Sequence, residues 1–402
     1  MSTTSTSNEK LTFSWFVFGL MASVTFVGIL SELVPSGILP QMTEGLGVEE
    51  SEVGFLVGVY ALASAIAAIP LVSATLALNR KTLLMALLAG FAVANIVVGL
   101  SSSYAVIIAA RIVGGICAGV MWPMIAAYGT RLAPEKNMHG KAITVIMSGN
   151  TLGISIGLPA MTAIGLTFGW RSVFMVLGAI VAVIAVLSHF YLPEVKGEKL
   201  SKSNSPLAVL KMPSIQIVLL LTFLGVAAHY GIYTYITLLV ELLGFAGGIG
   251  VALLIFGIGS VISVIVSAKY IDAYLRPMIV LMLGVGGISM AMFLAFNGTI
   301  GISHVAFFLW GLAFGPLVTM FQTAVSKQVE NAKDIATSVQ SSVFNLSIMI
   351  ATWVGGLLLS QFPTTGVRHI VYLSLGCFIL AIIIAFLSKR TLQPSSMLSP
   401  HS

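Results

Sequence analysis

The chain has 402 residues, of which 58% are hydrophobic and only 8% are charged. Soluble globular proteins carry about 25% charged residues, so this composition excludes an ordinary cytosolic protein or enzyme. A helix needs about 20 apolar residues to cross a bilayer core, and twelve such helices use roughly 240 residues. The chain is therefore long enough for one polytopic membrane protein with short loops and ends.

The net charge of +6 and the two cysteines indicate no further ligand or partner class. The basic residues form no cluster of the kind that binds nucleic acid, so we expect no nucleic-acid partner. Cys117 and Cys377 both lie in apolar runs, which indicates neither a disulfide framework nor a metal site. We expect no cofactor.

Twelve long apolar runs are bounded by charged residues, proline or glycine. They lie near residues 13–40, 51–77, 82–100, 104–130, 139–166, 172–191, 213–241, 249–270, 277–296, 302–327, 334–361 and 370–388. The first run is long, contains Glu32 and lacks a small-residue cleavage pattern, so we interpret it as a span rather than a signal peptide. We predict an all-α integral membrane protein with twelve transmembrane helices.

The longest polar stretch runs from Pro193 to Pro213, and it divides the twelve spans six and six. Its charges alternate without an apolar face, which is typical of a solvated linker. We predict an N-terminal six-helix bundle over residues 1–192, a cytoplasmic linker over 193–212 and a C-terminal six-helix bundle over 213–402.

Basic residues are shared unequally between the two sides of the predicted membrane. With the N-terminus inside, sixteen of the nineteen Lys and Arg residues fall in inner segments. The first outer loop instead carries Glu44, Glu49, Glu50 and Glu52. Because Lys and Arg concentrate on the cytoplasmic side of membrane proteins, we expect both termini to be cytoplasmic.

Glu32 lies deep in the first span, where it cannot reach bulk water. A carboxylate in hydrocarbon costs several kcal/mol unless it is neutralised, paired or beside a water-filled cavity. Glu32 is therefore the leading candidate for a group that binds and releases a proton; the alternative is a structural acid paired permanently with a base. Arg111 lies at a comparable depth in the fourth span and is the expected partner, unless it extends to the outer interface.

Arg111, Gly115, Ala118 and Trp122 share one face of the fourth span by their spacing. The small residues permit a close approach of a neighbouring helix. Trp122 offers either an aromatic wall for substrate or ordinary packing.

The seventh span has the densest polar and aromatic run inside any span, AAHYGIYTYITLLVE from residue 227. His229 and Tyr233 are four residues apart, and Tyr230, Thr234 and Thr237 form a neighbouring stripe. These side chains form either a hydrogen-bonded core or a polar wall that contacts substrate. His229 is also the second candidate for proton coupling, because imidazole can titrate.

Other polar side chains in the spans either contact substrate or hold helices together by hydrogen bonds. We name as substrate-binding candidates Trp122, Asn150, Tyr230, Tyr233, Thr234, Gln322, Gln340 and Asn345.

The fifth span carries Gly149, Gly153 and Gly157 at four-residue spacing, followed by Pro159. This ridge of small residues permits tight helix contact, and the proline removes one backbone hydrogen bond and bends the helix. We expect this helix to help gate a path between the two bundles.

Taken together, these motifs resemble the Major Facilitator Superfamily. The resemblance is to its twelve-span drug:proton antiporter branch, which includes bacterial sugar, arabinose and purine-nucleoside efflux permeases. The matching segments are SELVPSGILPQM from residue 31, AARIVGGICAGVMWPM from 109, GNTLGISIGLPAMTAIGLTFGWRSVF from 149, AHYGIYTYI from 228 and SSVFNLSIMIATWVGG from 341. Each segment alone is a weak signal, but the combination is specific and extends over nearly the whole chain.

The resemblance implies two pseudo-symmetric six-helix bundles with the binding site between them. It places Glu32 on the branch's protonatable position and Arg111 on the family's span-four arginine. It further implies a monomer in the bacterial cytoplasmic membrane, with protons and a small molecule as transported partners.

The loop between spans two and three departs from the family pattern G-x-x-x-D-R-x-G-R-K. It reads VSATLALNRK, with Leu76 in place of the Asp and Asn79 in place of the second Gly. Arg80 and Lys81 persist. Because the Asp helps to latch the two halves in the family, we expect the pseudo-repeat loop AKYIDAYLRP to supply a latch through Asp272 and Arg276 instead.

These residues predict a secondary active transporter that expels a sugar, nucleoside or drug-like molecule in exchange for protons, by alternating access. A facilitator or importer of the same fold fits the same residues, because direction depends on the gradients. A membrane-embedded enzyme is disfavoured, because the six histidines are scattered and Gly140-Lys141 lacks the surroundings of a P-loop. A receptor would not require a buried Glu–Arg pair.

Overall fold

The structure of the protein, a computed structural model, describes residues 14–133, 139–197, 209–296, 299, 301–329 and 333–388. The helices of the N-terminal part are α1 (Trp15–Gly37), α2 (Leu39–Leu46), α3 (Glu50–Thr75), α4 (Arg80–Leu100), α5 (Tyr104–Leu132), α6 (His139–Leu152), the π-helix η2 (Gly153–Gly157), α7 (Leu158–Phe168) and α8 (Trp170–Tyr191). Those of the C-terminal part are α10 (Pro213–Tyr233), α11 (Ile236–Leu242), α12 (Gly248–Ala295), α13 (Ile302–Ser326), α14 (Lys333–Gln361) and α15 (Gly366–Leu387). Within these ranges the structure contains twelve segments long and apolar enough to cross a membrane, which confirms the predicted all-α fold with twelve spans.

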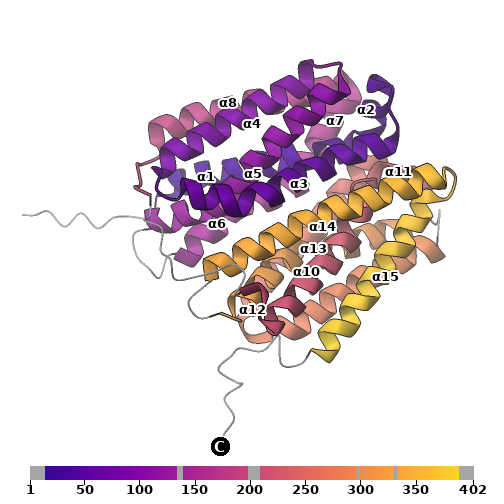
Figure 1. Cartoon of the computed structure of the whole chain (residues 1–402). Coiled ribbons are helices and arrows are strands. Elements are labelled where there is room, and N and C mark those ends of the chain that lie inside the picture. Colours follow the sequence, from indigo (N-terminus) through magenta and orange to yellow (C-terminus); the bar gives the residue numbers. More distant parts are fainter. Residues whose placement is uncertain are drawn as a thin grey trace, which may run out of the picture.

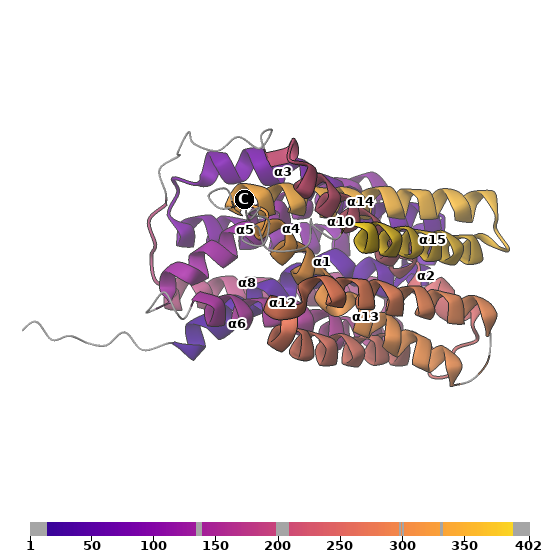
Figure 2. The ribbon, with the colours of Figure 1, turned by 90° about the horizontal axis from the view of Figure 1, so that it is seen from below.

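The helices gather in two groups that lie side by side (Figure 1). We call α1 to α8 the N-terminal half and α10 to α15 the C-terminal half. Seen from below, the long axes of the helices remain roughly parallel, and α12 lies beside α13, its main packing partner (Figure 2). The exact boundaries at residues 192 and 213 stay a prediction, since much of the linker, residues 198–208, lies outside the described residues.

The bundle has two ends, which we name by residues. The Glu49 end holds α2, the turn before α3, and the connections after α11 and α14; the Asn79 end holds the turn between α3 and α4 and the segment that follows α8. Because the number of spans is even, α1 begins and α15 ends on the same side, that of the Asn79 end.

Spans one and seven are both broken near the Glu49 end. Ile38 has non-helical angles (φ −132°, ψ 27°) between α1 and α2, and Tyr235 has similar ones (φ −107°, ψ 28°) between α10 and α11. Broken helices leave backbone groups unpaired, and transporters commonly use them to build sites between their halves. The sequence prediction continued both spans past these points, to residues 40 and 241; Gly37 directly precedes the first break, whereas no glycine or proline lies within three residues of the second.

Spans eight (Gly248–Ser267) and nine (Tyr274–Ala295) are separate, as expected from the sequence, with only six residues between them. The range α12 covers both spans, because helical residues continue up to Tyr274, which has non-helical angles (φ −126°, ψ 30°). Pro277 cannot donate a hydrogen bond to the carbonyl four residues earlier, so the helical hydrogen bonding is interrupted there. The chain therefore turns from one span into the next without a long loop.

The two halves pack together along α3 and α14 and along the fifth span and α12. Ser360 Oγ donates to Glu49 Oε2 over 3.4 Å at the Glu49 end, and Ser155 Oγ donates to the Gly257 carbonyl over 3.1 Å near the middle. Gly257 is required by this approach, because a Cβ there would lie 2.5 Å from Ser155 Cα. In this conformation the halves are in close contact at the Glu49 end.

Candidate functional site

The centre of the N-terminal half is organised by a proline in α1. Pro35 has no N–H, so it cannot donate the helical hydrogen bond to the carbonyl oxygen of Ser31. Arg111, from α5, donates from Nη1 to this oxygen. The proline therefore leaves a free acceptor inside the span, immediately before Glu32.

Arg111 is buried, and its other hydrogen bonds also go to carbonyl oxygens. Nη2 donates to the Glu32 carbonyl over 2.9 Å, and Nε donates to the Leu56 carbonyl of α3 over 3.0 Å. The guanidinium carbon lies 4.3 Å from the centroid of the Tyr60 ring, a cation–π geometry. Arg111 thus joins three spans through backbone atoms and one aromatic face.

Glu32 is 4% exposed, and its Oε1 has no hydrogen-bond partner within the part of the chain that the structure describes. Its carboxyl group is close enough to interact electrostatically with Arg111, with Tyr60 and, across the interface, with Tyr230 of α10. The sequence predicted that Glu32 and Arg111 come together, and the structure places them together. However, the guanidinium donates hydrogen bonds to the carbonyl oxygens of Ser31 and Glu32, beside the carboxyl group. Pro35 frees the Ser31 carbonyl oxygen for this contact.

The C-terminal half faces this group with aromatic side chains. We define the aromatic cluster as His229, Tyr230 and Tyr233 of α10, Phe256 of α12, and Trp310 and Phe314 of α13. The His229 ring is stacked on Phe314, with a centroid distance of 3.4 Å, and on Tyr233, at 4.7 Å, while the Trp310 ring is tilted against it at 5.4 Å. Its proposed role in proton coupling stays a prediction.

Several buried polar atoms on this side have no hydrogen-bond partner among the described residues. They are His229 Nδ1, Tyr233 Oη, Thr234 Oγ1, Thr237 Oγ1, Trp310 Nε1 and both amide atoms of Gln340. Buried polar groups in proteins are nearly always hydrogen-bonded, because leaving one unpaired costs free energy. The set therefore consists of donors and acceptors that a bound polar molecule or water can satisfy.

The other predicted substrate residues are not equally placed. Asn345 is buried and donates from Nδ2 to the Ser341 carbonyl over 2.9 Å. Trp122 and Asn150 are half-buried. Gln322 is exposed in this conformation. Substrate contact by any of these four residues stays a prediction.

The fifth span contains a π-helix, η2, over Gly153–Gly157, shortly before Pro159, where the sequence predicted a bend. Gly153 and Gly157 pack against Phe26 on α1, within the N-terminal half. The opposite face, through Ser155, contacts α12 of the C-terminal half. This helix therefore lies between the two halves, as a gating role requires.

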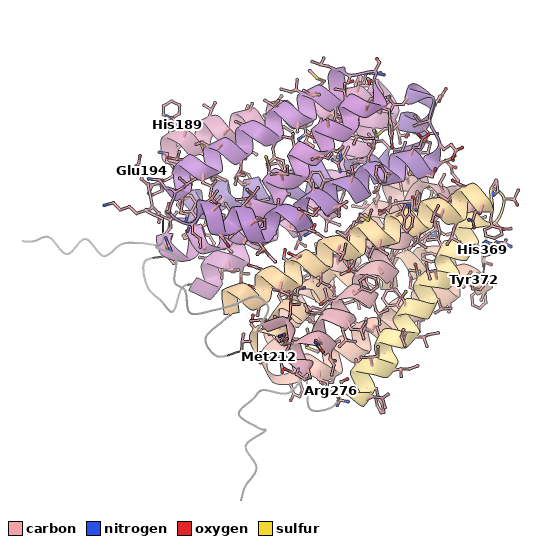
Figure 3. All side chains as sticks on the ribbon, in the orientation of Figure 1. His189, Glu194, Met212, Arg276, His369 and Tyr372 are labelled. Carbon is pink, nitrogen blue, oxygen red and sulfur yellow. The ribbon has the colours of Figure 1, made fainter. Side chains whose placement is uncertain are left out.

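The turn that departs from the family pattern contacts the segment after α8. Asn79 Nδ2 donates to Glu194 Oε2 over 3.3 Å, and the Arg80 backbone N–H donates to the Val195 carbonyl over 2.8 Å. Arg80 Nη2 donates to the Leu76 carbonyl over 3.1 Å, and Lys81 N–H donates to Asn79 Oδ1. These contacts lie within the N-terminal half and its continuation at the Asn79 end, where Figure 3 labels Glu194.

The alternative latch residues lie in α12. Arg276 Nη2 donates to the Phe386 carbonyl over 2.9 Å, so in this conformation it holds the last turn of α15, next to which Figure 3 labels it. The side chain of Asp272 lies outside the described residues. A latch made by these two residues stays a prediction.

Sequence reasoning missed Tyr60 and Asn95, which lie beside Arg111 and Ser31. Both are neutral, so neither interrupts its apolar run in the way that Glu32 does. A single amide in the third span was the available signal for Asn95, since an unpaired amide in hydrocarbon is costly.

Twelve spans in two halves, together with a buried carboxyl group and several buried polar atoms that have no partner among the described residues, define the class of membrane transport proteins. Residues 21–335 match the family profile described as Major Facilitator Superfamily. The chain belongs to the Major Facilitator Superfamily and is a transporter rather than an enzyme.

Individual relatives agree with this assignment. The chain is 27% identical over 371 residues to the "Probable sugar efflux transporter" of Mannheimia succiniciproducens, covering 90% of this chain and 92% of the relative. Its fold is similar to that of a bacterial homologue of the human lysosomal transporter Spinster in an inward-facing, unoccupied conformation (TM-score 0.75, 15% identity, 94% of this chain and 97% of that one). It is also similar to a point mutant of the nucleoside transporter NupG (TM-score 0.71, 13% identity, 94% of this chain and 99% of that one).

Proposed function

We propose that the protein is a proton-coupled exporter of a small neutral molecule rich in hydroxyl groups, a sugar above all. The observation that carries the proposal is the buried Glu32 carboxyl group, which has an oxygen without a partner among the described residues and lies near enough to Tyr230 of the C-terminal half to interact with it electrostatically. The name of the Mannheimia relative supports the substrate class and the direction.

In the proposed cycle, protonation of the Glu32 carboxyl group alternates with binding of the substrate. When the Glu49 end opens, Glu32 takes up a proton and substrate leaves. When the Asn79 end opens, Glu32 releases the proton and new substrate binds. Such a cycle runs only if proton and substrate have unequal affinities for the two conformations.

The polar atoms of the C-terminal half support a neutral, hydroxyl-bearing substrate. Tyr233, Thr234 and Gln340 offer hydroxyl and amide groups that act as both donors and acceptors, and this is what sugar hydroxyl groups require. The flat rings of the aromatic cluster provide surfaces for the apolar faces of a sugar or nucleoside. The described site carries no second cationic group beside Arg111, which is already bonded to carbonyl oxygens.

We further propose that the Asn79 end faces the cytoplasm of a bacterium and that both termini lie there, in the inner membrane. The charge asymmetry supports this orientation, because Glu49, Glu50 and Glu52 lie at the other end and most basic residues lie at this one. A monomer is the corresponding expectation.

The test is proton movement driven by substrate. Purified protein in proteoliposomes with a trapped pH dye is exposed to L-arabinose, lactose or inosine, which represent a pentose, a disaccharide and a nucleoside. We expect at least one sugar to move protons in the opposite direction, and a protonophore to abolish its uphill transport. Sugar flux that is unaffected by a protonophore and moves no protons would instead identify a facilitator of the same fold.

A further inference from the structure

A cavity of about 10 Å³ lies behind the Glu32 turn of α1. Its polar lining consists of Ser31, Tyr60, Asn95 and Arg111, and the rest of its wall is apolar. A volume of this size holds about one water molecule, provided that two to four polar partners surround it. The four polar side chains meet that condition.

Asn95 connects α4 to the same turn. Its side chain is buried, and Nδ2 donates to Ser31 Oγ over 3.1 Å and to the Phe91 carbonyl over 2.8 Å. Ser31 is therefore held twice: Arg111 bonds to its carbonyl, and Asn95 bonds to its hydroxyl. Because Ser31 precedes Glu32, these two bonds fix the direction in which the Glu32 side chain leaves the helix.

Tyr60 supplies the second observation. Its hydroxyl is buried and has no hydrogen-bond partner in the described ranges, while its ring packs under the Arg111 guanidinium and borders the cavity. A buried hydroxyl without a partner costs about 1–3 kcal/mol, and one water in the cavity removes that cost.

We infer that Asn95 is a positioning residue for the Glu32 carboxyl group, acting through Ser31, and that Asn95 and Tyr60 bind one water molecule in the cavity beside Arg111. This inference rests on the proposed proton coupling. The water and the Asn95 amide hold the Ser31–Glu32 turn in one geometry while Glu32 gains or loses its proton. The titratable groups that face Glu32 are Arg111 from α5, Tyr60 from α3 and Tyr230 from α10, and an Asn95 variant alters none of them.

The test follows the Glu32 carboxyl group directly by infrared difference spectroscopy. The C=O stretching band of a protonated carboxyl group is recorded against pH in reconstituted protein, and the part that is absent from Glu32→Gln is assigned to Glu32. Asn95→Leu keeps the side-chain volume and removes the amide. We expect it to move the titration midpoint by about 0.5–1 pH unit, the equivalent of one lost hydrogen bond.

Further variants separate positioning from general damage. Ser31→Ala should shift the midpoint in the same direction, and adding it to Asn95→Leu should shift the midpoint no further, because Asn95→Leu already removes the Asn95–Ser31 bond. Tyr60→Phe should produce a smaller shift through loss of the water. Ser289→Ala is the matched control, because it removes a buried hydrogen bond from Ser289 Oγ to the Ala306 carbonyl in the C-terminal half.

The possible outcomes differ in what they contradict. A wild-type midpoint in both Asn95→Leu and Ser31→Ala overturns the positioning role, as does full additivity of the two shifts. A wild-type midpoint in Tyr60→Phe overturns the water site. If Glu32→Gln removes no titrating band, the proposed proton coupling itself fails, whatever the Asn95 variants do.

Discussion

Two sets of buried polar side chains, one in each half of the molecule, differ in their hydrogen bonding. In the N-terminal half, the donors of Arg111 and Asn95 are used on carbonyl and hydroxyl oxygens of neighbouring helices. In the C-terminal half, Tyr233, Thr234 and Gln340 are equally buried but have unpartnered polar atoms. A satisfied network is rigid, whereas unpaired groups are free to bind a ligand. The comparison leads us to propose that the N-terminal half binds and releases the proton and that the C-terminal half binds the substrate.

The largest effect is expected from Arg111→Met. It leaves three buried carbonyl oxygens with fewer partners and removes the charge beside Glu32, and each orphaned acceptor costs about 1–3 kcal/mol. We expect loss of transport and a clear drop in the thermal unfolding temperature in detergent. Adding Pro35→Ala, which restores an N–H for the Ser31 carbonyl, should recover part of the stability. An Arg111→Met variant with unchanged stability would show that the hydrogen bonds of Arg111 do not stabilise the N-terminal half.

A large steric effect is expected where the halves touch. Gly257→Val places side-chain atoms against Ser155, where even a Cβ lies 2.5 Å from Cα. The variant should lose the conformation that is closed at this contact, and its transport rate should fall by at least about tenfold, since strain of about 1–3 kcal/mol is typical of overpacking. Gly250→Ala in the same helix is the control, because nothing lies within 4 Å of its Cβ position. Equal transport rates in the two variants would show that this contact does not limit the cycle.

An intermediate effect is expected in the C-terminal half. Tyr233→Phe, Thr234→Val and Gln340→Leu each remove a group that is unpartnered without ligand. Each should raise the KM for the transported sugar by about fivefold, as expected for one lost hydrogen bond, and leave the number of protons moved per sugar unchanged. A changed proton-to-sugar ratio with an unchanged KM would show that these C-terminal residues act on proton movement and not on substrate binding, which contradicts the proposal.

The smallest effect is expected at the Asn79 end. Asn79 caps α4 by accepting a hydrogen bond from the Lys81 N–H, and its amide also contacts Glu194. Asn79→Ala should cost about 1 kcal/mol of stability through loss of the cap, with transport nearly unchanged. Asn79→Asp retains a capping oxygen and should retain more stability. Strongly impaired transport in Asn79→Ala would show that this turn still controls the conformational change.

The spans and the two ionisable residues of the centre could be predicted from the sequence. Each span is a long apolar run, and Glu32 and Arg111 are conspicuous because charge is so costly there. The target of Arg111 could not be predicted. Pro35 is visible four residues after Ser31, but only the fold brings Arg111 of a different span to the freed carbonyl.

The sequence also could not show which face of each span points toward neighbouring helices and which points toward lipid. In a soluble helix the polar face marks the solvent, but in a membrane both lipid and neighbouring helices are apolar, so the pattern carries little directional information. Gln322 is exposed and Gln340 is buried, although both looked alike in the sequence. For the same reason the neutral residues Tyr60 and Asn95 gave no signal comparable to that of a charge.

The central claim is that Glu32 couples proton movement to transport without being needed for substrate exchange. The direct measurement compares Glu32→Gln with Glu241→Gln, an exposed glutamate at the end of α11, in proteoliposomes that contain the transported sugar. We predict that Glu32→Gln keeps sugar-for-sugar exchange but loses all accumulation driven by a pH gradient, while Glu241→Gln keeps both. Accumulation at the wild-type level in Glu32→Gln would contradict the account.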